Sequence, residues 1–343
     1  MIVTVREALV RIGAVAGVVA ASLALTLGGA AAQDKTFVMK MSTPTLNDVP
    51  DTFGKEFGAA LEKESGGRIK PELYPASQLG AIPRQIEGTQ FGAVQCAIIP
   101  PEFFVGVDER FEVMAAPGLV ASLAHGQKVA ADPAVLKLML SLGANKGLHG
   151  VGMFMAEPIS VVSRTPIRHI ADFKGKKIRV FASDFQKAAF ERLGATPVAM
   201  TLGDVLPALQ QGTIDGALTG VGPVTHMHFQ DAAKYVTLSN QSAIFLMVEV
   251  SQKWYDSLPK DLRAMVDKHG AAESIAINPW AADHRQRVEA EWTATGGELI
   301  SFPAEEQATL MKTLSDVGQE VSKSKPAVAA AYQIMTEAAQ RLK

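Results

Sequence analysis

The stretch Lys177-Ile178-Arg179-Val180 decides the fold, because it is a short β-like run that begins a regular alternation. Residues 184–193 have the apolar spacing of a helix that ends at Gly194, and Pro197-Val198-Ala199-Met200 resembles a second strand. Another helix follows and is stopped by Gly212, after which a third strand begins. Strands that alternate with helices predict an α/β protein with a largely parallel sheet.

The first half of the chain repeats this pattern. Gln90-Phe91-Gly92-Ala93-Val94-Gln95 is similar to Gln210-Gln211-Gly212-Thr213-Ile214-Asp215, and a Leu-Gly pair precedes each segment. The similarity suggests two lobes built on one plan. Two unrelated helix-glycine-strand corners that look alike by chance are the alternative.

The last third of the chain is helical in pattern, over 256–291 and again over 304–342. Pro279 should kink or break the first of these segments. Helices at the end of a two-lobe chain pack back over both lobes, so we expect several crossings between them. We predict that lobe I comprises residues 33–157 and roughly 246–285. Lobe II and its packing helices then comprise residues 158–245 and roughly 286–343.

The first residues have the order of a secretory signal. Arg6 and Arg11 precede an apolar run over 12–27, and Ala30-Ala31-Ala32 supplies small residues for cleavage. We expect export to the periplasm with cleavage near Ala32, and a retained anchor is the alternative. No later stretch approaches the roughly 18 to 20 apolar residues of a spanning helix.

Composition and motifs restrict the function. The formal net charge of −2 over 343 residues gives no indication of nucleic-acid binding. Cys96 is the single cysteine and lies in a buried-strand pattern. The sequence contains no nucleophile elbow, zincin, P-loop or dinucleotide motif, so we predict no enzyme activity, no cofactor and no metal. The alternative is a secreted metal-dependent enzyme that uses His226 and His228.

Arg179 is the candidate binding residue that the strand pattern itself provides. Ile178 and Val180 should face one side of their strand, so Arg179 faces the other, near the carboxyl end. Ligands of open parallel sheets bind at that end. A guanidinium there can grip a carboxylate with two hydrogen bonds. A surface arginine is the alternative that the residues leave open.

The ordered motifs of the chain resemble one family, the extracytoplasmic solute receptors of tripartite ATP-independent periplasmic (TRAP) transporters. The similarity covers nearly all of the chain after the signal segment. The segments that carry it are Ser65-Gly66-Gly67-Arg68-Ile69, Gln78-Leu79-Gly80, Asp172-Phe173-Lys174-Gly175-Lys176-Lys177-Ile178-Arg179-Val180, Leu193-Gly194-Ala195, Met200-Thr201-Leu202-Gly203-Asp204-Val205 and Trp254-Tyr255-Asp256-Ser257-Leu258-Pro259.

The resemblance implies a two-lobe periplasmic binding protein of type II-like fold, with mixed sheets flanked by helices and C-terminal helices that cross both lobes. Such a receptor captures a small organic acid and delivers it to the small and large membrane subunits of a TRAP permease. The family's carboxylate-clamping arginine falls on Arg179, and Thr219 takes the place of the usual amide. Glu157 stands where a second arginine often lies, which disfavours a simple dicarboxylate or a sialic-acid-like ligand and favours one that carries a hydrogen-bond donor or a positive charge.

Further candidate contacts follow the ends of predicted strands, and for the aromatic residues a place in the core is equally compatible. These candidates are Asn47, Glu102, Phe103, Phe154, Phe181 and Phe245. A receptor for an ATP-driven (ABC-type) importer would share the fold class and is the second binding-protein alternative.

Overall fold

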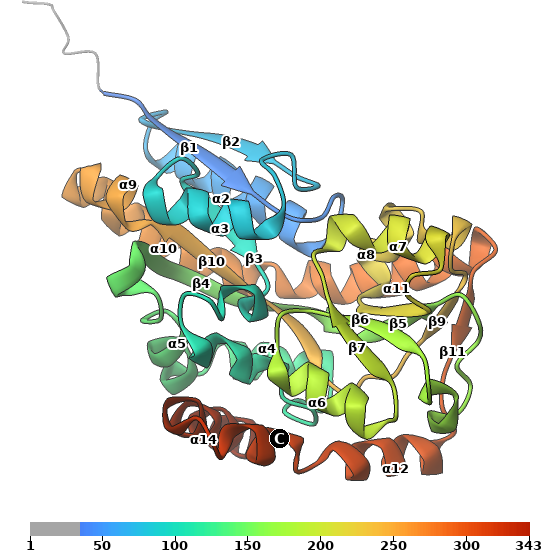
Figure 1. The fold of residues 1–343 in the computed structure, drawn as a ribbon. Helices are drawn as coiled ribbons and strands as arrows, with labels where there is room; N and C mark the ends of the chain where they lie inside the picture. The colour runs from blue at the N-terminus through green and yellow to red at the C-terminus, as the bar shows by residue number, and fades with distance from the viewer. Residues whose placement is uncertain (1–34) are drawn as a thin grey trace, which may run out of the picture. The chain divides into compact units, whose positions relative to one another are not determined.

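Two β-sheets organise the computed structural model, which describes residues 35–343 (Figure 1). The predicted signal peptide and its cleavage site lie outside the described residues. Residues Phe37–Lys343, which contain both sheets, form one compact unit. None of the helices between residues 35 and 343 has the length and apolar character needed to cross a membrane.

The first sheet has the strand order β2-β1-β3-β10-β4. Its first three strands are mutually parallel, and β10 runs antiparallel to both β3 and β4. We call this sheet and the helices around it lobe I. The strands are β1 (Phe37–Ser42), β2 (Ile69–Tyr74), β3 (Cys96–Ile99), β4 (Leu148–Pro158) and β10 (Ala243–Ser251).

The second sheet has the strand order β11-β9-β5-β8-β6-β7. Strands β6, β7 and β8 are mutually parallel, whereas β5 runs antiparallel to β8 and β9. We call this sheet and its helices lobe II. The strands are β5 (Ser160–Ser163), β6 (Lys177–Val180), β7 (Thr196–Ala199), β8 (Gly216–Thr219), β9 (Tyr235–Thr237) and β11 (Glu298–Ile300).

The two sheets follow one plan. The order β2-β1-β3-β10-β4 of lobe I corresponds to β7-β6-β8-β5-β9 of lobe II, with the same parallel and antiparallel pairs. Gly92 and Gly212 both end the helix before the third parallel strand in the left-handed conformation, with φ of 85° and 69°. The structure therefore confirms the internal repeat that the sequence suggested.

Two strands connect the lobes directly. Strand β4 of lobe I passes through Ile159 into β5 of lobe II, and β9 of lobe II returns through a short loop to β10 of lobe I. The two connections are hydrogen bonded to each other, because Ile159 N donates to the Ser242 carbonyl (3.0 Å) and Asn240 N donates to the Ile159 carbonyl (3.1 Å). These two hydrogen-bonded connections are the places where the sheets of the two lobes are joined by strands.

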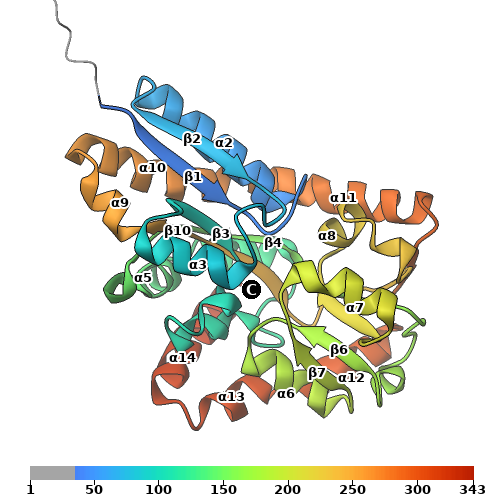
Figure 2. The same cartoon turned by 45° about the horizontal axis from the view of Figure 1, so that its top comes forward.

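Helices flank both sheets and make further crossings. The break that Pro279 predicts separates α10 from α11, and these helices pack against β4 and α8 respectively. At the end of the chain, α12 and α13 pack on α6 of lobe II (Figure 2). The last helix, α14, packs on α4 and α5 of lobe I. The mixed sheets, flanking helices and C-terminal crossings confirm the predicted fold class. The residue boundaries of the lobes stay a prediction.

The helices have the following bounds: α2 (Val49–Glu64), α3 (Ile82–Phe91), α4 (Leu123–Ala130), α5 (Pro133–Met139), α6 (Asp184–Arg192), α7 (Val205–Gln211), α8 (Val221–His226), α9 (Gln252–Ser257), α10 (Lys260–Ala276), α11 (Asn278–Ala294), α12 (Ala304–Leu314), α13 (Val317–Ser322) and α14 (Pro326–Arg341). Two 3-10 helices also matter below, η1 (Pro101–Phe104) and η2 (Glu109–Ala115).

Candidate functional site

A cavity lies between the two lobes, where the carboxyl ends of their parallel strands meet. The empty space between its lining residues is about 500 Å³, a figure that includes volume open to solvent. The lining comes from both lobes: Pro44, Thr45, Asp48, Val49, Pro50, Ile82, Pro100, Phe103, Ala156, Glu157, Arg179, Phe181, Leu202, Thr219, Pro223, Ile244 and Leu246.

Arg179 lies in the wall of this cavity and is 1% exposed. Its Nε donates to the carbonyl oxygen of Met200 (3.0 Å) after β7, and its Nη1 donates to the carbonyl oxygen of Leu218 (2.9 Å) in β8. The guanidinium carbon lies 4.6 Å from the centroid of the Phe181 ring. The two strands that flank β6 therefore fix the direction of the side chain.

Arg179 forms no ion pair with any residue between 35 and 343, and its Nη2 forms no hydrogen bond with any of them. Burial lowers the pKa of Arg179 to about 9, so the group is still charged at neutral pH. An unpaired buried cation is costly. This position therefore suits an anion that arrives from outside the chain.

Phe103 and Phe181 close one side of the cavity. Phe103 belongs to η1 of lobe I and Phe181 follows β6 of lobe II, and their rings stack with centroids 5.3 Å apart. Because the two rings come from different lobes, their contact depends on the closed arrangement of the lobes. Thr219, the last residue of β8, lines the same cavity.

Glu157 also lines the cavity, but the protein itself occupies its carboxylate. The two oxygens accept from the backbone N–H groups of Val221 (2.8 Å) and Gly222 (3.3 Å), which begin α8. Nη1 of Arg285 from α11 lies 3.1 Å from Oε2 of Glu157. Burial raises the pKa of Glu157, and the Arg285 charge and these N–H groups oppose that change. The Glu157 carboxylate therefore links the end of β4 in lobe I to helices α8 and α11.

Glu102 is fully buried beside the cavity, in η1, and is absent from the cavity lining. Neither carboxylate oxygen has a hydrogen-bond partner among the described residues. Burial raises the pKa of Glu102 to about 8, and the Arg179 charge partly opposes this change. The side chain is therefore a neutral acid at pH 7.

Asp48 is a lining residue that the sequence analysis missed. It caps the N-terminus of α2, is 2% exposed, and burial raises its pKa to about 8. The signal that could have identified it is its position after the first strand, where an aspartate precedes Val49 and Pro50 at a helix start.

Three predicted contacts lie elsewhere. Phe154 stacks on Phe53 in the core of lobe I, with ring centroids 4.5 Å apart. Phe245 is fully buried in a second apolar cluster, because Ile244 and Leu246 beside it take the cavity face of β10. Asn47 is exposed, with φ of 56°, in the turn before α2. None of the three lines the cavity.

The histidine pair of the alternative hypothesis does not face a common centre with further ligands. His226 ends α8, and His228 follows in the left-handed conformation with φ of 56°. Over residues 35–343 the structure has no group of three or more His, Cys, Asp or Glu side chains arranged to hold a metal. Burial lowers the pKa of His226.

Comparisons with known proteins agree on one family. The model of the DctP family, described as bacterial extracellular solute-binding protein, family 7, matches residues 41–325. The chain is 30% identical over 316 residues to the C4-dicarboxylate-binding periplasmic protein DctP of Rhodobacter capsulatus, which covers 91% of this chain and 93% of that protein.

Solved structures share the fold at lower identity. The sugar acid binding protein DctPAm of Advenella mimigardefordensis, in complex with galactonate, has a TM-score of 0.84 and 20% identity, covering 90% of this chain and 99% of that one. A TRAP periplasmic solute binding protein of Shewanella oneidensis with bound succinate has a TM-score of 0.80 and 23% identity, covering 88% and 99%.

Proposed function

This chain belongs to the DctP family of bacterial extracellular solute-binding proteins, and from that premise we propose that it is the periplasmic receptor of a TRAP transporter. In this proposal the protein captures a small organic acid between its lobes. It then delivers the acid to a permease made of a small and a large membrane subunit. Relatives whose names or complexes specify C4-dicarboxylate, succinate and galactonate support an organic acid as the ligand class.

The observation that carries the proposal is the unpaired guanidinium of Arg179 in the wall of the interlobe cavity. Two backbone carbonyls hold it in place and leave Nη2 for a guest. A carboxylate would supply both the missing negative charge and an acceptor for Nη2. The bound acid would thus relieve an electrostatic cost that the empty protein bears.

Capture would proceed by closure of lobe I over an acid held on lobe II. The adjacent β4–β5 and β9–β10 connections would act as the hinge, and the Phe103–Phe181 stack would form as the cavity closes. Closing the cavity removes water from around the ion pair, which strengthens it. A permease that favours the open state would release the acid.

Neither alternative from the sequence is favoured. A metal-dependent enzyme would need ligands in addition to His226 and His228, and the described residues group none with them. The family match supports a solute receptor rather than an enzyme. A receptor for an ABC-type importer would share only the general fold class.

A two-step experiment tests the proposal. Native mass spectrometry of protein purified without added ligand should detect a retained organic acid. A thermal-shift panel of monocarboxylates, dicarboxylates and sugar acids should then identify acids that raise the melting temperature, because a ligand that binds only the folded state stabilises it. If no acid is retained and none raises the melting temperature, the proposed function is wrong.

A further inference from the structure

The wall of the interlobe cavity is mostly hydrocarbon. Five lining residues have polar side chains, namely Thr45, Asp48, Glu157, Arg179 and Thr219. The other lining residues are prolines, alanine, phenylalanines and aliphatic residues. An acid that carries several hydroxyl groups would lose hydrogen bonds to water that such a wall does not replace. The wall therefore suits a ligand with an apolar body.

The charges of the lining allow one carboxylate. Arg179 is the single cationic residue among those that line the cavity. Arg285, which contacts the lining residue Glu157, is also bound to Glu289 and to the Pro158 carbonyl. A second carboxylate on the ligand would enter a site whose remaining ionisable groups, Asp48 and Glu157, are both acids. No cation would compensate its loss of hydration.

From this lining we infer that the ligand is a monocarboxylate with a small apolar body, aliphatic or aromatic, rather than a dicarboxylate or a sugar acid. The inference rests on the proposed function of the cavity as an organic-acid site. The carboxylate binds Arg179 of lobe II, and the hydrocarbon body lies against residues such as Pro100, Ile244 and Leu246 of lobe I. This ligand class differs from the succinate and galactonate bound in two of the similar structures.

Isothermal titration calorimetry on the dialysed full chain tests this ligand class with five probes: 4-methylpentanoate, benzoate, phenylacetate, succinate and galacturonate. At least one of the three apolar monocarboxylates should bind at least about tenfold more tightly than succinate and galacturonate, because neither of those finds partners for its extra polar groups. Succinate or galacturonate as the tightest ligand would overturn the inference. So would five equal dissociation constants.

A pair of variants tests the apolar wall itself. Ile244→Thr should weaken binding of the tightest monocarboxylate several-fold, because it replaces a methyl-bearing surface of the cavity with a hydroxyl. Ile275→Thr is the matched control, since Ile275 is 59% exposed and outside the cavity lining. Leu202→Thr tests the wall from lobe II if the first variant does not fold. An unchanged dissociation constant in the folded cavity variant contradicts the assignment of the wall.

The outcomes separate this inference from the proposed function. If succinate or galacturonate binds tightest and Arg179→Gln abolishes that binding, the cavity is an organic-acid site and only the inference fails. If no acid is retained in native mass spectrometry and neither the five probes nor the thermal-shift panel contains an acid that binds, both fail.

Discussion

Strand β6 of lobe II and strand β1 of lobe I hold the same place between two parallel neighbours, but they carry different residues there. Arg179 of β6 pairs with Ala217 of β8, and at the same register Ser42 of β1 pairs with Ala97 of β3. One repeat thus has a guanidinium where the other has a small hydroxyl. The shared strand order fixes the position, and the sequence decides which lobe contains the charge.

The buried ionisable groups beside the cavity differ in the same way. Lobe I contributes Asp48 and Glu102, and burial raises the pKa of each to about 8, which favours their neutral forms at pH 7. The third acid of lobe I, Glu157, is held by Arg285 and by the N–H groups that begin α8. Lobe II contributes Arg179, which is still charged. In our proposal, charge recognition therefore belongs to lobe II, and lobe I encloses the ligand. Each of the following predictions tests this division.

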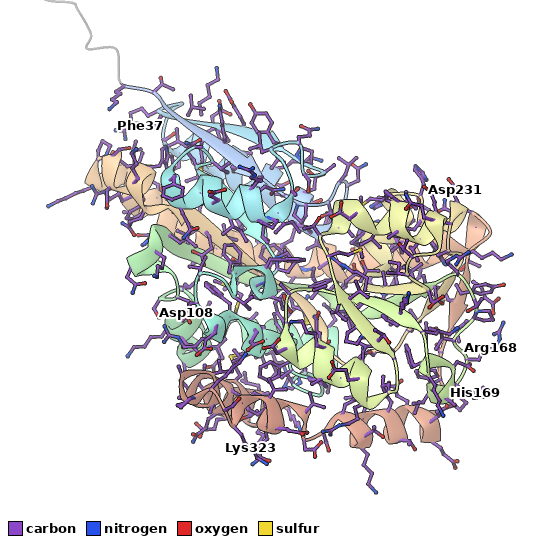
Figure 3. All side chains as sticks on the ribbon, viewed as in Figure 1. Phe37, Asp108, Arg168, His169, Asp231 and Lys323 are labelled. Atoms are coloured by element: carbon purple, nitrogen blue, oxygen red, sulfur yellow. The ribbon has the colours of Figure 1, made fainter. Side chains whose placement is uncertain are left out.

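The largest expected effect is on Arg179. Arg179→Gln should weaken binding of the best acid by about 2 to 5 kcal/mol, because the carboxylate loses its charged partner in a desolvated site. Arg168→Gln is the matched control, since Arg168 lies in lobe II at the surface and pairs with the exposed Glu298 (Figure 3). Calorimetry of both variants checks this prediction. If Arg179→Gln and Arg168→Gln bind the acid equally well, lobe II does not recognise its charge through Arg179.

Glu157→Gln tests the junction of the lobes. The change removes the charge that faces Arg285, although Arg285 keeps its ion pair with Glu289. We expect the free energy of unfolding to fall by about 2 kcal/mol, because a half-satisfied buried cation remains. Urea denaturation of Glu298→Gln, which breaks the exposed pair with Arg168, should show a much smaller loss. Equal losses would contradict a stabilising role for the Glu157 carboxylate at the junction of the lobes.

Asp48→Asn tests the neutral state of the lobe I acid. Burial raises the pKa of Asp48 from 3.8 to about 8, so between these values the folded protein holds a proton that the unfolded chain has released. The stability that this group contributes falls as the pH rises through that window. The variant cannot ionise, so its stability relative to the wild type should rise with pH, by at most about 1.4 kcal/mol per unit.

Urea denaturation between pH 4 and 8 measures this difference. Asn is also a good N-cap, so the start of α2 should survive the change. Asp231→Asn serves as the control because Asp231 is exposed on lobe II. A difference that does not change with pH would show that Asp48 is ionised in the folded protein.

Phe103→Leu should have the smallest effect. The Phe103–Phe181 stack joins the lobes in the closed arrangement, and aromatic pairs contribute about 0.5 to 1.5 kcal/mol beyond their burial. We expect affinity for the best acid to fall by about that amount, while the melting temperature of the empty protein changes little. Phe91→Leu, at an exposed position in α3, should alter neither. A loss of stability without a loss of affinity would show that the stack stabilises the fold and does not contribute to closure on the ligand.

The sequence predicted the plan of the fold and part of the cavity lining. Alternating strands and helices with glycine stops at Gly92 and Gly212 suggested two similar lobes, and the sheet topology decided against a chance similarity. Strand alternation made Arg179 a candidate opposite Ile178 and Val180, near the carboxyl end of its strand, but left a surface arginine possible. The resemblance to the TRAP receptors selected Arg179, and the structure places it in the cavity lining.

Other contacts could not be predicted, because the strands that join the lobes are buried on both faces. Periodicity does not say which buried face meets the cavity, so Phe245 was chosen while Ile244 and Leu246 line it. Asp48 looks like an ordinary helix cap in the sequence, and its burial in the cavity depends on a lobe encoded more than a hundred residues later.

The most direct test compares an acid with its uncharged amide. Calorimetry should give the dissociation constants of the tightest acid and of the corresponding amide for the wild type and for Arg179→Gln. We expect the wild type to bind the acid at least about a hundredfold more tightly than the amide, and the variant to lose this preference. The same preference for the acid in both proteins would contradict it.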